Sequence, residues 1–461
     1  MSELPQSIAA GRLLATVGER RAKGKALRRR TPRGEHAAWT APADRADPIA
    51  LLEESSRGRL AALVPIRYGR MLASPFTFLR GSTAVMTCDL ARTPVTGLHV
   101  QACGDCHLLN FGTFASPERA LLFDVSDFDE TLRAPWEWDI KRLATSFVVA
   151  GREKGLAERR ARDAAEACAR SYRRRMRRFA DMRALEVWYA RIEVASSFDP
   201  ARRPKVRTPG AQIVRRVSVR AADHVVERLT EVVAGRRRIA DNPPLIFHQP
   251  SGDPSEQRVR ELFHHYRRSL PDERRILLDR FEPIDLAMKV VGVGSVGTRC
   301  AVLLLSAGAD DHLILQVKEA RASVLEPYAG KSGYSNHGQR VVVGQRLMQS
   351  ASDIFLGWSR SENQGFDFYV RQLRDMKGSV NLAAMSACDL REYAKSCGAA
   401  LARAHARTGD AAQLAGYLGS GDAFEQAISR FAVAYADQTE RDHAAFERAV
   451  RAGRLVAERD Q

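Results

Sequence analysis

Three residues in short loops after two predicted strands have the side chains that phosphoryl transfer requires. Asp105 and Asn110 follow the strand predicted for Thr96–Cys103, and Asp127 follows the strand predicted for Ala120–Ser126. One carboxylate can accept or orient the proton of an attacking hydroxyl. An amide oxygen and a second carboxylate can hold Mg²⁺, which prefers oxygen ligands. The rest of such catalysis is positioning and charge neutralisation, so this segment is the first candidate site.

The wider pattern is Gly-Asp-x-His-x-x-Asn followed by Asp-Phe-Asp. It resembles the catalytic loop and metal loop of aminoglycoside phosphotransferases and choline kinases. By that resemblance Asp105 is the catalytic base, Asn110 and Asp127 are the magnesium ligands, and His107 braces the loop. Asp139 stands where those kinases place a structural aspartate on the next helix. The alternative is a loop whose polar residues only cap turns. Asp105, His107, Asn110 and Asp127 are called the acidic group below.

The same segment contains Cys103-Gly-Asp-Cys106-His107, which has the spacing of c-type haem attachment. Haem attachment takes place outside the cytoplasm, and the first residues lack the charged start, apolar block and cleavage site of an export signal. The sequence has no second thiol pair to complete a zinc site. It also has no run of 18 apolar residues, so no membrane span is expected. We expect a cytoplasmic protein without haem.

A second candidate group lies far along the chain. It consists of three glycines and a lysine, here called the glycine–lysine group: Gly292, Gly294, Gly297 and Lys318. The glycines separate the strands predicted for Ala287–Gly292 and Arg299–Ser306. A dinucleotide-binding fold places a helix after such glycines, whereas a strand follows here. Strand, glycine loop and strand is the kinase arrangement, in which backbone N–H groups cover the phosphates of ATP.

Lys318 ends the next predicted strand, His312–Lys318, and resembles the kinase lysine that pairs with the α and β phosphates. Its carboxylate partner is left open. Glu319 would point to the other face of the strand. Glu326 is possible, and the helix predicted for Gly338–Ser350 offers only glutamines.

Further basic residues are candidate contacts for phosphates or an anionic substrate. Those in or after the strand predicted for Phe366–Leu373 are Arg371, Arg374 and Lys377. Those before the acidic group are Arg67, Arg70 and Arg80. A solvated strand end is an equally good interpretation of the first set, and stabilising salt bridges are an equally good interpretation of the second.

In ordinary kinases the glycine loop and lysine precede the catalytic loop, and here they follow it. The fold class expected is therefore α+β, a protein-kinase-like two-lobed fold in circularly permuted order. The predicted parts are a basic N-terminal arm (1–50), a mostly helical lobe with the catalytic loop (51–280), a β-rich lobe with the glycine loop (281–380), and C-terminal helices packing on the helical lobe (381–461). The helix predicted for Asp389–Ala406 would be the one that leads into the catalytic loop.

Nearly the whole chain, from about residue 30 to 450, resembles a bacterial family catalogued as domain of unknown function 2252. The segments that carry this resemblance are Leu63–Gly81, Cys103–Gly112, residues 290–299, Gln316–Ala320 and Tyr369–Ser379. The family name implies no activity, so the kinase interpretation rests on the residues.

The net charge of +17 suits an anionic partner, but a high-GC genome whose codons favour arginine and alanine is the preferred explanation. The arginine-rich helix predicted for Leu156–Arg178 is expected to be a solvated face. Few aromatic residues interleave its arginines, so nucleic-acid binding is not expected. The predicted function is an ATP- and Mg²⁺-dependent phosphotransferase acting on an unidentified small-molecule or protein hydroxyl. The alternatives are transfer of AMP and catalytically silent nucleotide binding.

Overall fold

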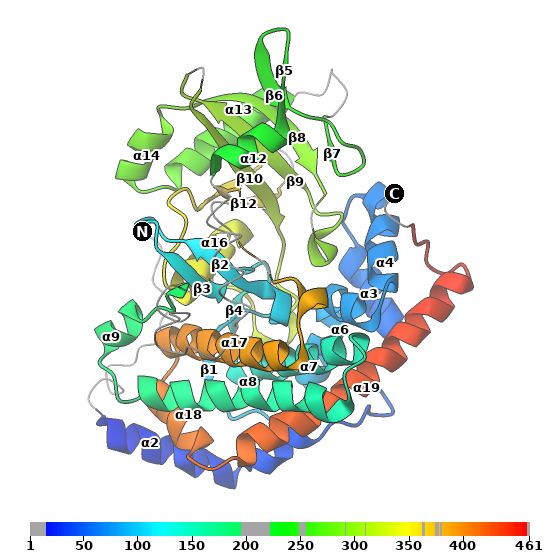
Figure 1. Ribbon diagram of the computed structural model, residues 1–461, viewed down its shortest axis with the longest axis vertical. Coiled ribbons are helices and arrows are strands. Elements are labelled where there is room, and N and C mark those ends of the chain that lie inside the picture. Colours follow the sequence, from blue (N-terminus) through cyan, green and yellow to red (C-terminus); the bar gives the residue numbers. More distant parts are fainter. Residues whose placement is uncertain are drawn as a thin grey trace.

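A computed structural model describes residues 15–194, 222–248, 255–290, 292–308, 310–361, 365–373, 378 and 380–458. The chain is a mixed α+β protein, as the sequence predicted. Figure 1 shows an antiparallel sheet at one end of the molecule and long helices at the other, with the short strands β2–β4 between them.

The larger sheet has the strand order β11-β12-β10-β9-β8-β7, and each adjacent pair is antiparallel. Its strands are β7 (Ile246–Phe247), β8 (Glu282–Lys289), β9 (Cys300–Ser306), β10 (His312–Ala320), β11 (Gly357–Arg360) and β12 (Asp367–Gln372). Along β9, Val302 and Leu304 belong to one apolar cluster, and Leu303 and Leu305 belong to another. Successive side chains of a strand point to opposite faces, so this continuous apolar run is explained by burial on both faces.

Elements that precede residue 281 cover both faces of this sheet. They are α12 (Ala222–Leu229), β5 (Thr230–Val233), β6 (Arg236–Ile239), α13 (Ser255–Arg268) and α14 (Asp272–Leu278). Tyr266 and Leu278 pack with one apolar cluster of the sheet, and Ile239 packs with the other. The β-rich part therefore begins before residue 281, at a boundary different from the one predicted. The covering elements are bound to the sheet by long-range packing, which no local pattern reveals.

Long helices build the main core. They are α7 (Trp136–Glu153), α8 (Glu158–Phe179), α17 (Ala387–Thr408) and α19 (Ala423–Arg451). Helix α7 is buried along nearly its whole length and contacts α8, α17 and α19. Helix α17 lies closest to α8 at Gly398, where a Cβ atom would overlap the backbone oxygen of Cys168. No helix within the described part of the chain has the length and apolar character that a membrane span requires.

Shorter elements complete the helical part and the strands beside it. They are α3 (Pro48–Ser56), α4 (Val64–Leu72), α5 (Pro75–Gly81), α6 (Thr83–Leu90), α9 (Ala184–Tyr189), α15 (Glu326–Ala329), α16 (His337–Met348), α18 (Ala411–Leu418), β1 (His99–Ala102), β2 (Phe111–Ala115), β3 (Leu121–Val125) and β4 (Leu132–Pro135). Strand β1 pairs with β4, and β2 pairs with β3.

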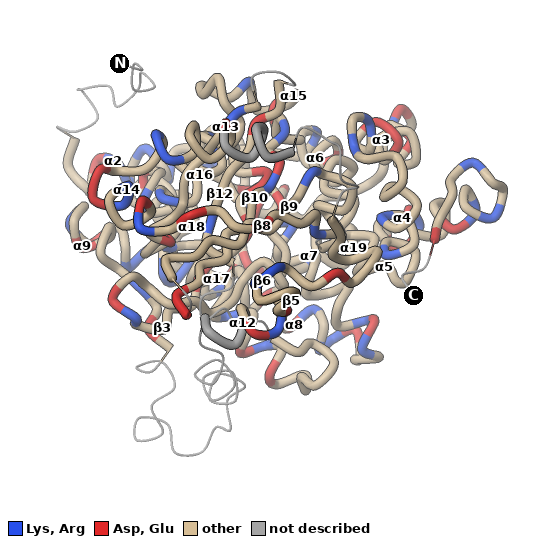
Figure 2. The backbone as a smooth tube through the Cα atoms, turned by 90° about the horizontal axis from the view of Figure 1, so that it is seen from above, with Lys and Arg blue, Asp and Glu red and all other residues tan. Residues whose placement is uncertain are grey.

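The arginine-rich face of α8 is mostly exposed, as expected. Its exposed members are Arg159, Arg160, Arg162, Arg174, Arg175, Arg177 and Arg178. Arg173 differs, because it is buried and forms an ion pair of 2.7 Å with Glu425. Figure 2 shows basic and acidic residues interspersed along the chain, so the excess positive charge is spread over many elements.

The described part of the N-terminal arm packs closely on the helical part of the protein. Helix α2 (Val17–Ala26) begins with a capping box between Thr16 and Glu19 and lies against α18, where Gly24 meets the backbone of Gln413. His36 is fully buried, and its Nε2 lies 2.7 Å from the Tyr417 hydroxyl. These contacts join residues that are far apart in sequence.

Gly398→Ala is expected to destabilise the protein, because the added methyl group meets backbone that cannot rotate away. Overpacking of this kind costs about 1–3 kcal/mol, which outweighs the helix propensity gained by alanine. Gly34→Ala is the control, since a Cβ atom there meets nothing within 4 Å. Urea denaturation should separate the two variants, and equal midpoints would contradict the close contact between α8 and α17.

Candidate functional site

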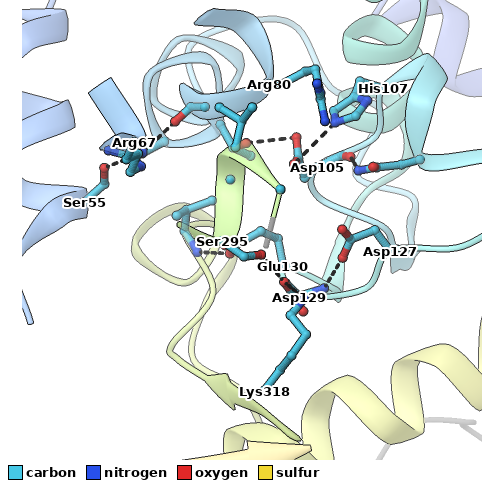
Figure 3. Close-up of a pocket in the computed structure, with 18 of the residues that line it drawn as sticks. Ser55, Arg67, Arg80, Asp105, His107, Asp127, Asp129, Glu130, Ser295 and Lys318 are labelled. Carbon is cyan, nitrogen blue, oxygen red and sulfur yellow. Dashed lines mark hydrogen bonds and ion pairs between the residues drawn. The ribbon is translucent and has the colours of Figure 1, made fainter. Parts of the chain in front are cut away.

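The two candidate groups line the same cavity, whose volume is about 170 Å³. The predicted residues on its wall are Asp105, His107, Asn110, Asp127, Gly292, Gly294 and Lys318. Figure 3 shows Asp105 from the loop after β1, Asp127 from the segment after β3, Ser295 from the glycine turn and Lys318 from β10 around this cavity. Gly297 does not line the cavity; it packs against Arg59.

The loop that carries Asp105 is held by the buried carboxylate of Asp139 on α7. Asp139 accepts the backbone N–H of Cys103 at 2.6 Å and that of Gly104 at 2.9 Å. His405 on α17 places Nε2 3.1 Å from the same carboxylate. Gly104 has a φ of 81°, which favours glycine, and a side chain there would meet Glu130. The loop is therefore fixed before any ligand binds.

The two oxygens of Asp105 have different surroundings. Oδ1 accepts hydrogen bonds from Arg142 Nη2 at 2.5 Å and Thr83 Oγ1 at 2.9 Å. Oδ2 lies 3.8 Å from His107 Nε2. Burial acts to raise the pKa of Asp105, but the charge of Arg142 and the surrounding hydrogen bonds outweigh it and hold the pKa below its usual value. Asp105 is ionised at neutral pH, and Oδ2 is the oxygen better placed to accept from a ligand.

His107 and Asn110 brace this loop from within. Leu109 donates its backbone N–H to His107 Nδ1 at 3.2 Å, and burial lowers the pKa of His107 to about 3. The ring is therefore neutral, and Nε2 carries its proton. Asn110 Nδ2 donates to the backbone oxygen of Asp105 at 2.7 Å, which leaves Oδ1 of the amide for a ligand.

Asp127 and Asp129 stand on either side of the buried Phe128 and both line the cavity. Burial and the neighbouring charge of Asp129 raise the pKa of Asp127. Burial opposes ionisation of Asp129 as well, but Lys318 outweighs it and lowers that pKa. Asp127 is the carboxylate of the pair without a lysine partner.

The partner of Lys318 is Asp129. Lys318 Nζ lies 2.6 Å from Asp129 Oδ2, and Ser295 Oγ donates to the same oxygen at 2.9 Å. The Tyr369 hydroxyl donates to Oδ1 at 2.5 Å. Burial alone would lower the pKa of Lys318, but Asp129 and Tyr369 raise it above the usual value. Glu326, the partner considered from the sequence, lies instead 3.8 Å from His337.

The glycine loop is a short turn rather than an open hairpin. Residues Val293–Ser295 form a single 3₁₀ turn, closed by the bond from the Ser295 N–H to the Gly292 oxygen at 2.9 Å. A Cβ atom at Gly294 would lie 3.8 Å from Asp105 Oδ2. The turn therefore lies directly against the acidic group.

Four arginines also line the cavity: Arg59, Arg67, Arg80 and Arg371. The sequence singled out Arg67, Arg80 and Arg371 but not Arg59. Arg70 is not part of the lining, and Arg374 and Lys377 lie outside the described residues. Arg371 Nε donates to Gln316 at 3.1 Å, beside Lys318.

Sequence reasoning missed Asp129 and Arg142. The signal for Asp129 was available, because residues two apart in an extended segment point to the same side, so Asp127 implies Asp129. Nothing local reveals Arg142, which reaches Asp105 from α7. Cys103 and Cys106 are fully buried in the main core, which disfavours haem attachment at these thiols.

The fold and the site thus define a mixed α+β protein with a charged cavity built from two distant segments. The family model described as uncharacterized protein conserved in bacteria (DUF2252) matches residues 59–449. The chain belongs to this family, as its sequence motifs predicted. No curated protein and no solved structure matches it.

Asp139→Ala is expected to destabilise the protein by about 3 kcal/mol or more, because two buried N–H groups lose a charged acceptor. Glu153→Ala, near the end of the same helix in an exposed position, is the matched control. Chemical denaturation measures both. A variant as stable as the control would show that Asp139 does not hold the loop.

Proposed function

We propose that this protein is an ATP- and Mg²⁺-dependent phosphotransferase that acts on a hydroxyl acceptor. The observation that carries the proposal is that the acidic group and the glycine–lysine group border one cavity, although they are far apart in sequence. Each group supplies a different need of phosphoryl transfer, which requires charge neutralisation on the donor and positioning of the nucleophile.

The donor phosphates are assigned to the end of the cavity that contains Lys318. Lys318 and Arg371 supply positive charge there, and Lys318 is joined to the glycine turn through Asp129, which also accepts a hydrogen bond from Ser295. Gly292 and Gly294 have no side chains, so phosphate oxygens can approach their backbone closely.

The acceptor hydroxyl is assigned to Asp105. Its carboxylate is ionised, and Arg142 and Thr83 fix its orientation through Oδ1. Oδ2 can then accept the proton of a hydroxyl and align its oxygen with the phosphate. A carboxylate whose pKa is held low is a weak base, so orientation is the larger part of its contribution.

Asn110 and Asp127 are assigned to Mg²⁺. The donor set fits, since an amide oxygen and a carboxylate are hard oxygen ligands on one cavity wall. The raised pKa of Asp127, caused by burial and by Asp129, also fits, because a divalent cation there would offset the crowding of negative charge. When bound, Mg²⁺ would neutralise charge on the transferred phosphate.

A permuted kinase-like fold is part of the proposal. The end of α17 lies beside the start of the acidic-group segment, since the Gln101 N–H donates to Thr408 Oγ1 at 3.0 Å. A chain that ran from α17 directly into β1 would have the kinase order, with the sheet first. This proximity favours a circularly permuted kinase-like fold over the alternative that the two motifs are unrelated.

Nucleotide binding without transfer is a second candidate. It is favoured by the ion pair between Arg142 and Asp105, which holds the carboxylate in its ionised form and weakens it as a base. Transfer of AMP is the remaining alternative at this cavity. Turnover of Mg-ATP separates these cases, because silent binding gives no product, and AMP transfer releases pyrophosphate in place of ADP.

Mg-ATP is expected to stabilise the wild-type protein by about 2.7 kcal/mol at roughly 100 times its dissociation constant. Asp127→Asn should abolish the part of this gain that depends on Mg²⁺, because the variant loses a charged ligand of similar size. Thermal unfolding with ATP, with and without Mg²⁺, measures the effect.

Asp163→Asn is the control for this measurement, because Asp163 lies on α8 and does not line the cavity. It should retain the full response to Mg-ATP. The absence of any nucleotide effect on the wild-type protein would overturn the proposed function.

A further inference from the structure

Three arginines from neighbouring segments line the cavity. Arg67 belongs to α4, Arg80 to α5, and Arg59 to the segment just before them. Arg59 reaches the glycine turn, where it donates to the Val296 oxygen. Figure 3 shows Arg67 and Arg80 on one side of Asp105 and Lys318 on the other. The cavity therefore has basic side chains on both sides of the Asp105 carboxylate.

Arg67 is buried without an acidic partner. Arg67 is only 2% exposed. Its side chain donates hydrogen bonds to neutral acceptors, Ser56 Oγ at 2.8 Å and the Gly81 backbone oxygen at 2.7 Å. Burial and the charge of Arg59 lower the pKa of Arg67 to about 9. Burying a cation without a counter-ion costs free energy of desolvation, and a bound anion would offset that cost. The position of Arg67 therefore indicates an anion-binding site.

Arg80 and Arg59 have the same character. Among the described residues, no carboxylate forms an ion pair with Arg59, Arg67 or Arg80, and the buried Nε atoms of Arg67 and Arg80 have no hydrogen-bond partner. Arg59 donates to the backbone oxygens of Ser55 at 3.0 Å and Val296 at 2.6 Å. Asp105 and Asp127 act on Arg80 from a longer distance, and Glu130 and Glu319 act on Arg59, but none of these carboxylates lies within ion-pair distance.

Two other cations beside the cavity are paired with carboxylates. Arg142 is bonded to Asp105 at 2.5 Å, and Lys318 to Asp129 at 2.6 Å. Pairing therefore serves to position the cations near the proposed donor phosphates and the reacting centre. Arg67 and Arg80 lie across Asp105 from Lys318, where the group attached to the attacking hydroxyl would extend.

We propose that Arg67 and Arg80 bind an anionic group of the acceptor, a phosphate or a carboxylate, so that the protein phosphorylates an acidic hydroxyl compound. This inference rests on the proposed phosphotransfer function. Guanidinium groups suit it because their planar array of N–H donors matches the paired oxygens of both anions. The anion holds the acceptor by one end and leaves its hydroxyl at Asp105.

The test measures binding of inorganic phosphate, and separately acetate, to the full-length protein with Mg-ADP present at saturation, by isothermal titration calorimetry. Wild-type protein should bind at least one of the two anions, and which one identifies the class of acid. Arg80→Gln should weaken that binding about tenfold or more, as expected for loss of a charge-assisted hydrogen bond. Arg80→Lys should recover part of it.

Two further variants locate the anion. Arg174→Gln removes an exposed arginine of α8 and should bind the anion as the wild type does. Lys318→Met should weaken Mg-ADP while leaving the anion site in place. If Lys318→Met abolishes anion binding and Arg80→Gln does not, the anion binds at the donor end of the cavity. That result would overturn the inference.

Weaker Mg-ADP binding in Arg80→Gln, without an effect on the anion, would likewise assign the arginines to the nucleotide and refute the acceptor site. If neither phosphate nor acetate binds to the wild-type protein, the acceptor site is also refuted. These outcomes differ from failure of the proposed function, in which the wild-type protein binds no Mg-nucleotide at all.

Discussion

The Asp139 carboxylate is the interaction on which the geometry of the cavity depends. It is a buried charge, and such a charge is tolerated only when hydrogen bonds replace its lost hydration. The N–H groups of Cys103 and Gly104 supply this compensation, and so fix the loop before Asp105. His405 meets the same carboxylate, and its other nitrogen lies 2.9 Å from the Tyr172 hydroxyl. Three helices, α7, α8 and α17, are thereby held to one loop.

A second set of contacts joins the β-rich part to this fixed loop. Arg340 on α16 is buried and donates to the backbone oxygens of Thr131 at 2.6 Å and Asp129 at 2.9 Å. Lys318 and Tyr369, opposite each other on β10 and β12, bind the Asp129 carboxylate. The segment after β3 is therefore held from the sheet side, while the loop after β1 is held from the helix side. The cavity lies between these two attachments.

The sequence predicted local features well and long-range contacts poorly. Apolar runs located β9, β10, β12 and only the end of β8 (Glu282–Lys289), and residue types located most of the cavity wall. The partner of Lys318, the role of Arg142 and the close packing of the N-terminal arm were not predicted. Each depends on residues that are far apart in sequence and that only the fold brings together. The sequence near an arginine such as Arg67 therefore does not indicate whether it has a carboxylate partner.

Paired cations and unpaired arginines lie in different parts of the cavity. Lys318 and Arg142 have carboxylate partners, so their positions are set in the free protein. Arg67 and Arg80 have none among the described residues, so a ligand would complete their environment. Gly294 lies at the boundary, since even a Cβ atom there would lie 3.8 Å from Asp105 Oδ2. A bulkier side chain would extend toward the space that we assign to the hydroxyl and the phosphate, so the proposed chemistry favours glycine at this position.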